Sequence, residues 1–187
     1  MATLDTTELR RGTVFRYNGR VYLVLKYKHV KKGRGLAIVR VKVRDIERDA
    51  NLEKTFTSNE KVESEDLIHT KAQYLYADSE YAYFMDSEDY SQFQITLREV
   101  DWEKNFLVEG AKVDVIWLEG KVVSIQLPKK VSLKVKYTEP AVVGDTATSA
   151  TKKAELETGY ELQVPLFVKN NDLLVVNTES GDYVSKG

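Results

Sequence analysis

The chain has 187 residues, of which 42% are hydrophobic and 30% charged, and its formal net charge is −1. It contains no cysteine, which excludes disulfides, thiolate nucleophiles and cysteine-ligated zinc. No run of about 18 apolar residues could span a bilayer, and the first residues lack the basic and apolar regions of a secretory signal. We therefore expect a cytoplasmic protein without a membrane partner.

The charge is distributed unevenly along the chain. Residues 1–64 carry 15 Lys or Arg and 8 Asp or Glu, residues 65–127 carry 5 and 13, and residues 128–187 carry 8 and 8. This asymmetry predicts that the first third meets an anion and that the middle third does not. Because each segment is about 60 residues long, a size that can just bury its own core, the three segments are predicted to be three domains.

Strand patterns dominate the sequence. Short runs of β-branched and aromatic residues occur at 21–27, 36–43, 113–118 and 173–177. Asn18 and Gly19 form the residue pair of a type I′ hairpin, and further turn signals stand at 119–120 and 180–182. The pattern predicts an all-β chain of small barrels. Residues 77–86 and 177–184 both place a polar turn before an aromatic strand, so the second and third segments are predicted to repeat one barrel type.

A basic loop separates the predicted strands 21–30 and 36–44. Its residues are Lys31, Lys32, Gly33, Arg34 and Gly35. The flanking glycines leave Arg34 as the only large side chain at an apex that the two strands carry about 25 Å from the core. Residues 26–44 hold eight basic residues and no acid, which favours a phosphate-rich target over a solvated turn without a partner. A nucleotide-binding phosphate loop is excluded because a strand, not a helix, follows the glycines.

The other candidate sites are weak. Seven aromatic residues between 74 and 93 are expected to lie mostly in the core, and the negative charge of their segment argues against a single-strand groove there. The chain has only two histidines, and the acids at 86–89 lack the spacing of a calcium loop, so a solvated turn is expected. We expect no catalytic residues, no metal and no cofactor; the chain is predicted not to be an enzyme.

Three stretches share the pattern of one family. They are residues 12–24 (Gly-Thr-Val-Phe-Arg-Tyr-Asn-Gly-Arg-Val-Tyr-Leu-Val), the loop 31–35, and residues 152–168 continued at 177–184. Together they resemble the bacterial elongation factor P family over nearly the whole chain: its opening barrel, its Pro-Gly-Lys/Arg-Gly loop and its carboxy-terminal signature. The residues that match this signature are Gly159, Val164, Pro165 and Phe167.

The resemblance implies three small β-barrel domains in an L-shaped arrangement that mimics a tRNA. The first, 1–64, is SH3-like or KOW-like, and 65–127 and 128–187 are OB-folds. It also implies a monomeric translation elongation factor that binds the 70S ribosome between the P and E sites. There it contacts ribosomal RNA near the peptidyl-transferase centre and the P-site peptidyl-tRNA, stimulates peptide-bond formation and relieves stalling at consecutive prolines.

The resemblance also implies roles for two loops. Arg34 is the functional tip and a modification site, with Lys31, Lys32, Gly33 and Gly35 as the RNA-binding loop around it. The family's tRNA-contact loop matches Gly144, Asp145, Thr146, Thr148 and Ser149. An arginine tip excludes lysylation, so Arg34 is either rhamnosylated by a rhamnosyltransferase partner or left unmodified. Asn171 stands where the family usually has Gly, and Asn tolerates the positive φ expected there.

Two alternatives stay open. One is a single-stranded RNA-binding OB-fold protein without a ribosomal role, and the other is a rhamnose- or lysine-accepting carrier. Co-sedimentation with 70S particles separates the first of these from the translation factor.

Overall fold

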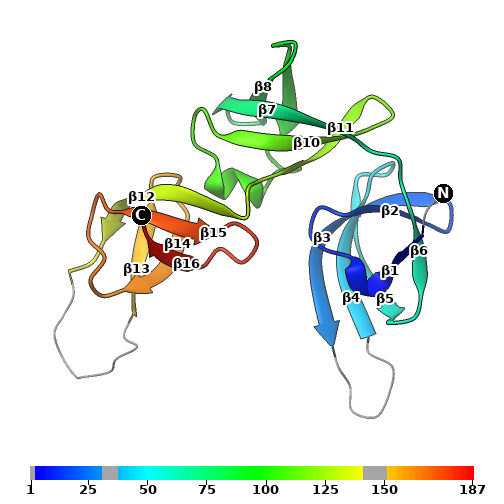
Figure 1. The fold of residues 1–187 in the computed structure, drawn as a ribbon, viewed down its shortest axis with the longest axis horizontal. Helices are drawn as coiled ribbons and strands as arrows, with labels where there is room; N and C mark the ends of the chain where they lie inside the picture. Colours follow the sequence, from blue (N-terminus) through cyan, green and yellow to red (C-terminus); the bar gives the residue numbers. More distant parts are fainter. Residues whose placement is uncertain (1–2, 31–37, 141–150) are drawn as a thin grey trace. The chain divides into compact units, whose positions relative to one another are not determined.

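The computed structural model describes residues 3–30, 38–140 and 151–187 (Figure 1). Within these ranges the chain forms strands β1 to β16 and two short 3₁₀ helices, η1 (Thr6–Glu8) and η2 (Glu103–Phe106). The strands assemble into three sheets, which confirms the prediction of an all-β chain. The same ranges contain no helix with the length and apolar character needed to cross a membrane.

The first sheet has six strands in the order β1-β6-β2-β3-β4-β5. Its strands are β1 (Thr3–Asp5), β2 (Val14–Tyr17), β3 (Arg20–Val30), β4 (Ile38–Asp45), β5 (Ala50–Thr57) and β6 (Lys61–Ser64). The turn between β2 and β3 consists of Asn18 and Gly19, whose φ values of 51° and 75° are those that a type I′ turn requires. Tyr17 pairs with Arg20 across this turn, so the hairpin predicted from the Asn-Gly pair is confirmed.

Strand β3 is covered on both faces near its start. Tyr22 and Val24 face the main core of the first sheet. That core consists of Leu9, Phe15, Tyr22, Val24, Val39, Val41, Val43, Phe56 and Val62. Val21 and Leu23 belong to a separate apolar cluster. Its other buried members are Val14, Ile116 and Val123. Both faces are therefore apolar here, because neither meets water.

The second and third sheets have five strands each. The second consists of β7 (Ile68–Ala77), β8 (Tyr81–Asp86), β9 (Gln92–Thr96), β10 (Lys112–Leu118) and β11 (Lys121–Gln126). The third consists of β12 (Lys130–Thr138), β13 (Thr151–Leu156), β14 (Glu161–Pro165), β15 (Leu173–Asn177) and β16 (Tyr183–Lys186). Their strand orders are β11-β10-β7-β8-β9 and β14-β13-β12-β15-β16.

These two orders are the same topology. In each sheet the first strand lies at the centre, beside the second strand on one side and the fourth on the other. Each first strand also has a register shift against its second strand, between Tyr74 and Tyr76 in β7 and between Val135 and Tyr137 in β12. Contacts between β14 and β16 bring the third sheet toward a closed OB-type barrel. The predicted repeat of one barrel type is confirmed.

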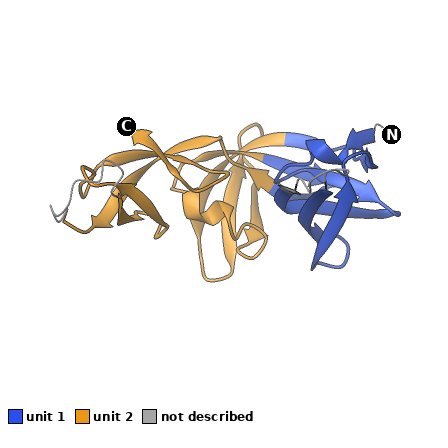
Figure 2. Cartoon of the chain, turned by 90° about the horizontal axis from the view of Figure 1, so that it is seen from below, with its two compact units in different colours: residues 1–69, 115–124 blue, residues 70–114, 125–187 orange. Residues whose placement is uncertain are grey.

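The chain divides into two compact units, residues 1–69 with 115–124 and residues 70–114 with 125–187 (Figure 2). The end of the β10–β11 hairpin thus groups with the first sheet. A buried hydrogen bond supports this grouping, because Arg44 Nη2 donates to the carbonyl oxygen of Val123 over 2.8 Å. The boundaries predicted after residues 64 and 127 stay predictions.

An aromatic cluster joins the segment before β10 to the third sheet. Phe106 is 1% exposed and belongs to the core of the third sheet. Trp102 Nε1 donates to the carbonyl oxygen of Thr178 over 2.7 Å, and the Phe106 and Tyr160 ring centroids lie 5.0 Å apart. Gly181 has a φ of 81°, and a Cβ there would lie only 2.0 Å from Tyr160 Oη. This packing makes the segment before β10 and the third sheet share one core.

Candidate nucleic-acid interface

Strands β3 and β4 form the long hairpin that the sequence predicts from the strand patterns 21–30 and 36–44, and they extend from Arg20 to Asp45. They pair antiparallel up to Val30 opposite Ile38, which is the last pair before the hairpin end. The predicted tip residues Lys31, Lys32, Gly33, Arg34 and Gly35 lie outside the described residues. The described strands therefore fix where this loop begins and ends.

A β-bulge decides which side chains of β3 face outward. The pairing shifts between Val24 and Lys26, so that Leu25 is the extra residue on β3. Strict alternation would place Lys26 on the same side as Val24, facing the core. Because the bulge takes up one residue, Lys26 and Lys28 instead lie on the outer face, while Tyr27 packs against the core.

Four cations stand opposite one another on this outer face. Lys26 pairs with Lys42, and Lys28 pairs with Arg40. All four side chains are exposed. Within the described part of the chain, none of them forms an ion pair. We call these four residues the cationic ladder.

Across the β3–β4 pair the cationic ladder is unfavourable for the isolated protein, and on the β5 side Glu53 lies opposite Lys42 alone. Directly opposed residues on antiparallel strands have Cβ atoms about 5 Å apart, and like charges at that spacing repel. The repulsion falls when a row of anions neutralises the ladder, and phosphates of a nucleic-acid backbone supply such a row. The arrangement thus fits a polyanion laid along the outer face toward the hairpin end.

Arg44 has a different role from the other basic residues of this stretch. It lies on the same outer face of β4 as Arg40 and Lys42, but it is only 7% exposed. Its guanidinium donates to Val123 at the covered base of the hairpin. The sequence analysis counts Arg44 among the eight basic residues expected to meet phosphate. In the structure its guanidinium instead holds the β10–β11 hairpin through Val123. Only the outer half of the hairpin is open and cationic.

The second predicted loop connects β12 to β13. Its residues Gly144, Asp145, Thr146, Thr148 and Ser149 lie outside the described residues, which resume at Thr151. The base of the loop is tied down on both sides. The backbone N–H of Thr138 donates to Asn170 Oδ1 over 2.7 Å, and its hydroxyl donates to the carbonyl oxygen of Lys153 over 2.8 Å.

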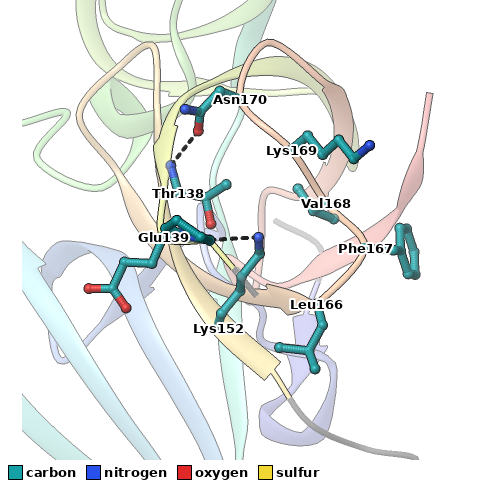
Figure 3. A pocket seen from close by; sticks show the side chains of 9 residues that line it. Thr138, Glu139, Lys152, Leu166, Phe167, Val168, Lys169 and Asn170 are labelled. Carbon is teal, nitrogen blue, oxygen red and sulfur yellow. Dashed lines mark hydrogen bonds between the residues drawn. The ribbon is translucent and has the colours of Figure 1, made fainter. Parts of the chain in front are cut away.

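A hollow of about 310 Å³ lies at this base (Figure 3). It is lined by Thr138, Glu139, Pro140, Lys152 and residues 166–170. Lys152 Nζ donates to the carbonyl oxygen of Glu139 over 2.8 Å, and Val168 is the fully buried residue of the lining. Phe167 is 60% exposed and its ring points away from Thr138 in Figure 3. Since the side chains of Thr138, Lys152 and Asn170 already bond to backbone, we interpret the hollow as a support for the loop.

The turn before β15 has a backbone conformation that favours glycine, although the residue there is Asn171. Asn171 has a φ of 69°, which confirms the expectation that Asn adopts the left-handed conformation there. Its N–H donates to the carbonyl oxygen of Val135 over 2.9 Å. Gly110 holds the matching place in the second sheet, with a φ of 83° and a hydrogen bond to the carbonyl oxygen of Tyr74.

The middle segment differs from the sequence-based expectation. Of its seven aromatic residues between 74 and 93, one, Phe84, is fully buried, and Tyr76 and Tyr90 are 56% and 69% exposed. The other four are half-buried: Tyr74, Tyr81, Tyr83 and Phe93. The expectation that most lie in the core is therefore wrong, and the bulge after Tyr74 explains Tyr76. The acids at 86–89 form a turn, in which Asp86 Oδ1 accepts the backbone N–H of Glu88.

Comparisons with known proteins agree with this architecture. Three family models match the chain: "Elongation factor P (EF-P) KOW-like domain" over residues 5–62, "Elongation factor P (EF-P) OB domain" over 67–125, and "Elongation factor P, C-terminal" over 131–186. Each model falls largely on one of the three sheets. The predicted order of a KOW-like domain followed by OB-type domains is confirmed.

Individual relatives include a curated protein and two solved structures. The chain is 41% identical over 183 residues to a curated elongation factor P of Mycoplasmopsis synoviae, covering 98% of both chains. Among solved structures, a eukaryotic translation initiation factor 5A from Methanococcus jannaschii matches at 21% identity and a TM-score of 0.38, covering 66% of this chain and 93% of the other. A translation initiation factor eIF-5A family protein from Naegleria fowleri matches at 18% identity and a TM-score of 0.36, covering 67% and 98%.

The 41% identity to a curated elongation factor P over 98% of the chain and the three consecutive domain matches lead to one conclusion. The chain belongs to the elongation factor P family of translation elongation factors.

Proposed function

We propose that this chain binds the 70S ribosome between the P and E sites, contacts the P-site peptidyl-tRNA and stimulates peptide-bond formation at consecutive prolines. The observation that carries the proposal is the cationic ladder on the outer face of β3 and β4. It is a row of exposed cations that runs toward the loop 31–35, and the acid opposite it on β5, Glu53, faces only Lys42. Ribosomal RNA and tRNA offer the phosphate row that such a surface needs.

In this proposal the ladder supplies affinity and the loop supplies function. Lys31 and Lys32 extend the basic surface, and Gly33 and Gly35 let the chain turn so that Arg34 reaches the CCA end of the peptidyl-tRNA. The chemical step belongs to the ribosome. The gain would be orientational, because holding the reacting ends in register lowers the entropic part of the activation free energy.

The loop of the third sheet would read the tRNA. Gly144, Asp145, Thr146, Thr148 and Ser149 offer hydrogen-bond donors and acceptors with little charge, and contacts of that kind discriminate more than they attract. The hydrogen bonds that tie Thr138 and Lys152 at the loop base support this role, because a fixed base limits where the loop can reach.

The remaining assignments belong to the same proposal. The protein acts as a monomer in the cytoplasm, without a cofactor and without catalysing a reaction of its own. Arg34 is either rhamnosylated by a dedicated rhamnosyltransferase or works unmodified.

Co-sedimentation with 70S ribosomes stalled at a triple-proline codon run tests the proposal. The double substitution Lys28→Ala/Arg40→Ala removes half of the ladder, and we expect roughly tenfold weaker binding, about 0.7 kcal/mol for each of the two cations removed. The matched control is Lys112→Ala/Lys121→Ala, which removes two exposed lysines from strands of the second sheet. It should bind as the parent does.

Two results would contradict the proposal. Equally weakened binding in the ladder variant and the control would mean that the ladder is not the contact surface. Tight binding to isolated single-stranded RNA without co-sedimentation would favour the alternative of an RNA-binding protein with no ribosomal role.

A further inference from the structure

A pair of stacked tyrosines lies exposed on the second sheet. Tyr76 of β7 and Tyr83 of β8 are direct cross-strand partners, with ring centroids 4.6 Å apart and an interplanar angle of 22°. Tyr76 is 56% exposed, and Tyr83 is partly exposed. A stacked pair held by strand pairing is already ordered before any partner arrives, so a contact made on it costs little conformational entropy.

The pair belongs to the outer face of its hairpin. Along β8 the side chains alternate, so that Ala82 and Phe84 face the core while Tyr81 and Tyr83 face outward. Tyr74, before the bulge in β7, packs inward against Phe84 with ring centroids 5.5 Å apart. The core therefore does not need the outer tyrosines.

Acidic groups border this pair. Residues 72–97 contain five Asp or Glu and no Lys or Arg. Asp78 lies in the β7–β8 turn, where Oδ1 accepts the backbone N–H groups of Glu80 and Tyr81 over 2.8 and 2.7 Å, and Oδ2 accepts the hydroxyl of Tyr83 over 2.8 Å. The backbone N–H donors lower the pKa of Asp78, so this carboxylate stays charged. Glu80 beside it is exposed.

We propose that this surface is a docking site for an arginine-rich segment of a protein partner. We call it the tyrosine face and define it as Tyr76, Asp78, Glu80, Tyr81 and Tyr83. A guanidinium can lie flat on the stacked rings and donate to the neighbouring carboxylates at the same time. The inference goes beyond the proposed function, since it concerns the sheet that carries no cationic ladder.

Charge decides between a protein and an RNA partner. Exposed aromatics stack on nucleic-acid bases when a positive groove holds the backbone. Here the surface around the tyrosines would be negative, because residues 65–127 carry 13 acids against 5 bases. The same field that repels phosphate attracts Arg and Lys. The tyrosine face therefore fits a basic protein segment and disfavours RNA.

The test is an NMR titration of the full-length ¹⁵N-labelled protein with the peptide Gly-Arg-Gly-Arg-Gly-Arg at low salt. We expect shift changes centred on residues 76–83 and at least fivefold weaker binding for Tyr76→Ala. Tyr76→Phe keeps the ring and should bind as the parent does. Tyr90→Ala is the matched control, because Tyr90 is 69% exposed in the same sheet but is not part of the tyrosine face.

The probes also separate the partner classes. The Lys version of the peptide should bind more weakly than the Arg version, because ammonium groups cannot stack as a plane. Shift changes elsewhere, no binding, equal binding by Tyr76→Ala, or stronger binding of hexauridylate to the tyrosine face would overturn the proposal.

Discussion

The hairpins β3–β4 and β7–β8 use the same backbone device to present opposite charges. In β3 the register shifts between Val24 and Lys26, and in β7 it shifts between Tyr74 and Tyr76. In both strands the side chain before the shift packs inward and the one after it faces outward. The comparison shows that one bulge can turn the side chains of a core strand outward, and that the residues after it then set the chemistry of the exposed face.

The largest effect is expected from a substitution in the loop at the end of the β3–β4 hairpin. Arg34→Ala should abolish the relief of stalling on a triple-proline reporter, because no other long side chain stands between the two glycines of the loop. Ribosome binding should fall only modestly, since the cationic ladder remains. A surface change of this kind usually alters the free energy of unfolding by no more than about 0.5 kcal/mol. In vitro translation of the reporter measures the first effect and pelleting measures the second.

Arg34→Lys sharpens this experiment. It keeps the charge and loses the planar five-donor group. If modification of Arg34 is required, Lys should fail as badly as Ala; if charge suffices, Lys should retain most activity. A folded Arg34→Ala protein that relieves stalling as well as the parent would remove Arg34 from the proposal.

A smaller effect tests whether repulsion within the cationic ladder lowers the free energy of unfolding of the protein without a partner. Lys28→Thr removes the repulsion with Arg40 and should raise the free energy of unfolding by about 0.5 kcal/mol. Lys61 offers the opposite case, because it pairs across the strands with Asp5, 4.0 Å from its carboxylate. Lys61→Thr should therefore give no gain. Urea unfolding compares the two, and a loss of stability in Lys28→Thr would mean that the ladder does not repel.

The smallest effect concerns the acidic hairpin. The backbone N–H groups of Glu80 and Tyr81 lower the pKa of Asp78 below its ordinary value of 3.8. A carboxylate with a lowered pKa in the folded state stabilises the fold above that ordinary value and loses this effect as the pH falls through the folded pKa. Asp78→Asn should therefore lose less stability than the parent between about pH 6 and about pH 2. An identical acid dependence would show that the turn does not depend on the charge.

Local signals in the sequence predicted much of the fold. Asn18 and Gly19 specify their turn through their tolerance of positive φ, and Asn171 does the same before β15. The hairpin around the basic loop follows from two strand patterns separated by Gly33 and Gly35. Features of this kind depend on neighbouring residues, so a single sequence contains them.

Features that depend on distant partners could not be predicted in this way. Arg44 is buried and donates its hydrogen bond to Val123, which lies 79 residues later in the chain. Phe106 and Trp102 pack with the third sheet, and no local pattern indicates that. The exposure of Tyr76 depends on a bulge, which simple alternation does not show. The loops 31–35 and 144–149 lie outside the described residues.

One measurement tests the contrast between the two hairpins most directly. Because the chain has no cysteine, Lys28→Cys and Glu80→Cys each create a single attachment point for a benzophenone photo-crosslinker. Both proteins are bound to ribosomes stalled on consecutive prolines and irradiated. We predict that position 28 forms crosslinks to RNA and that position 80 forms crosslinks to protein. RNA crosslinks from position 80 with none from position 28 would contradict the account.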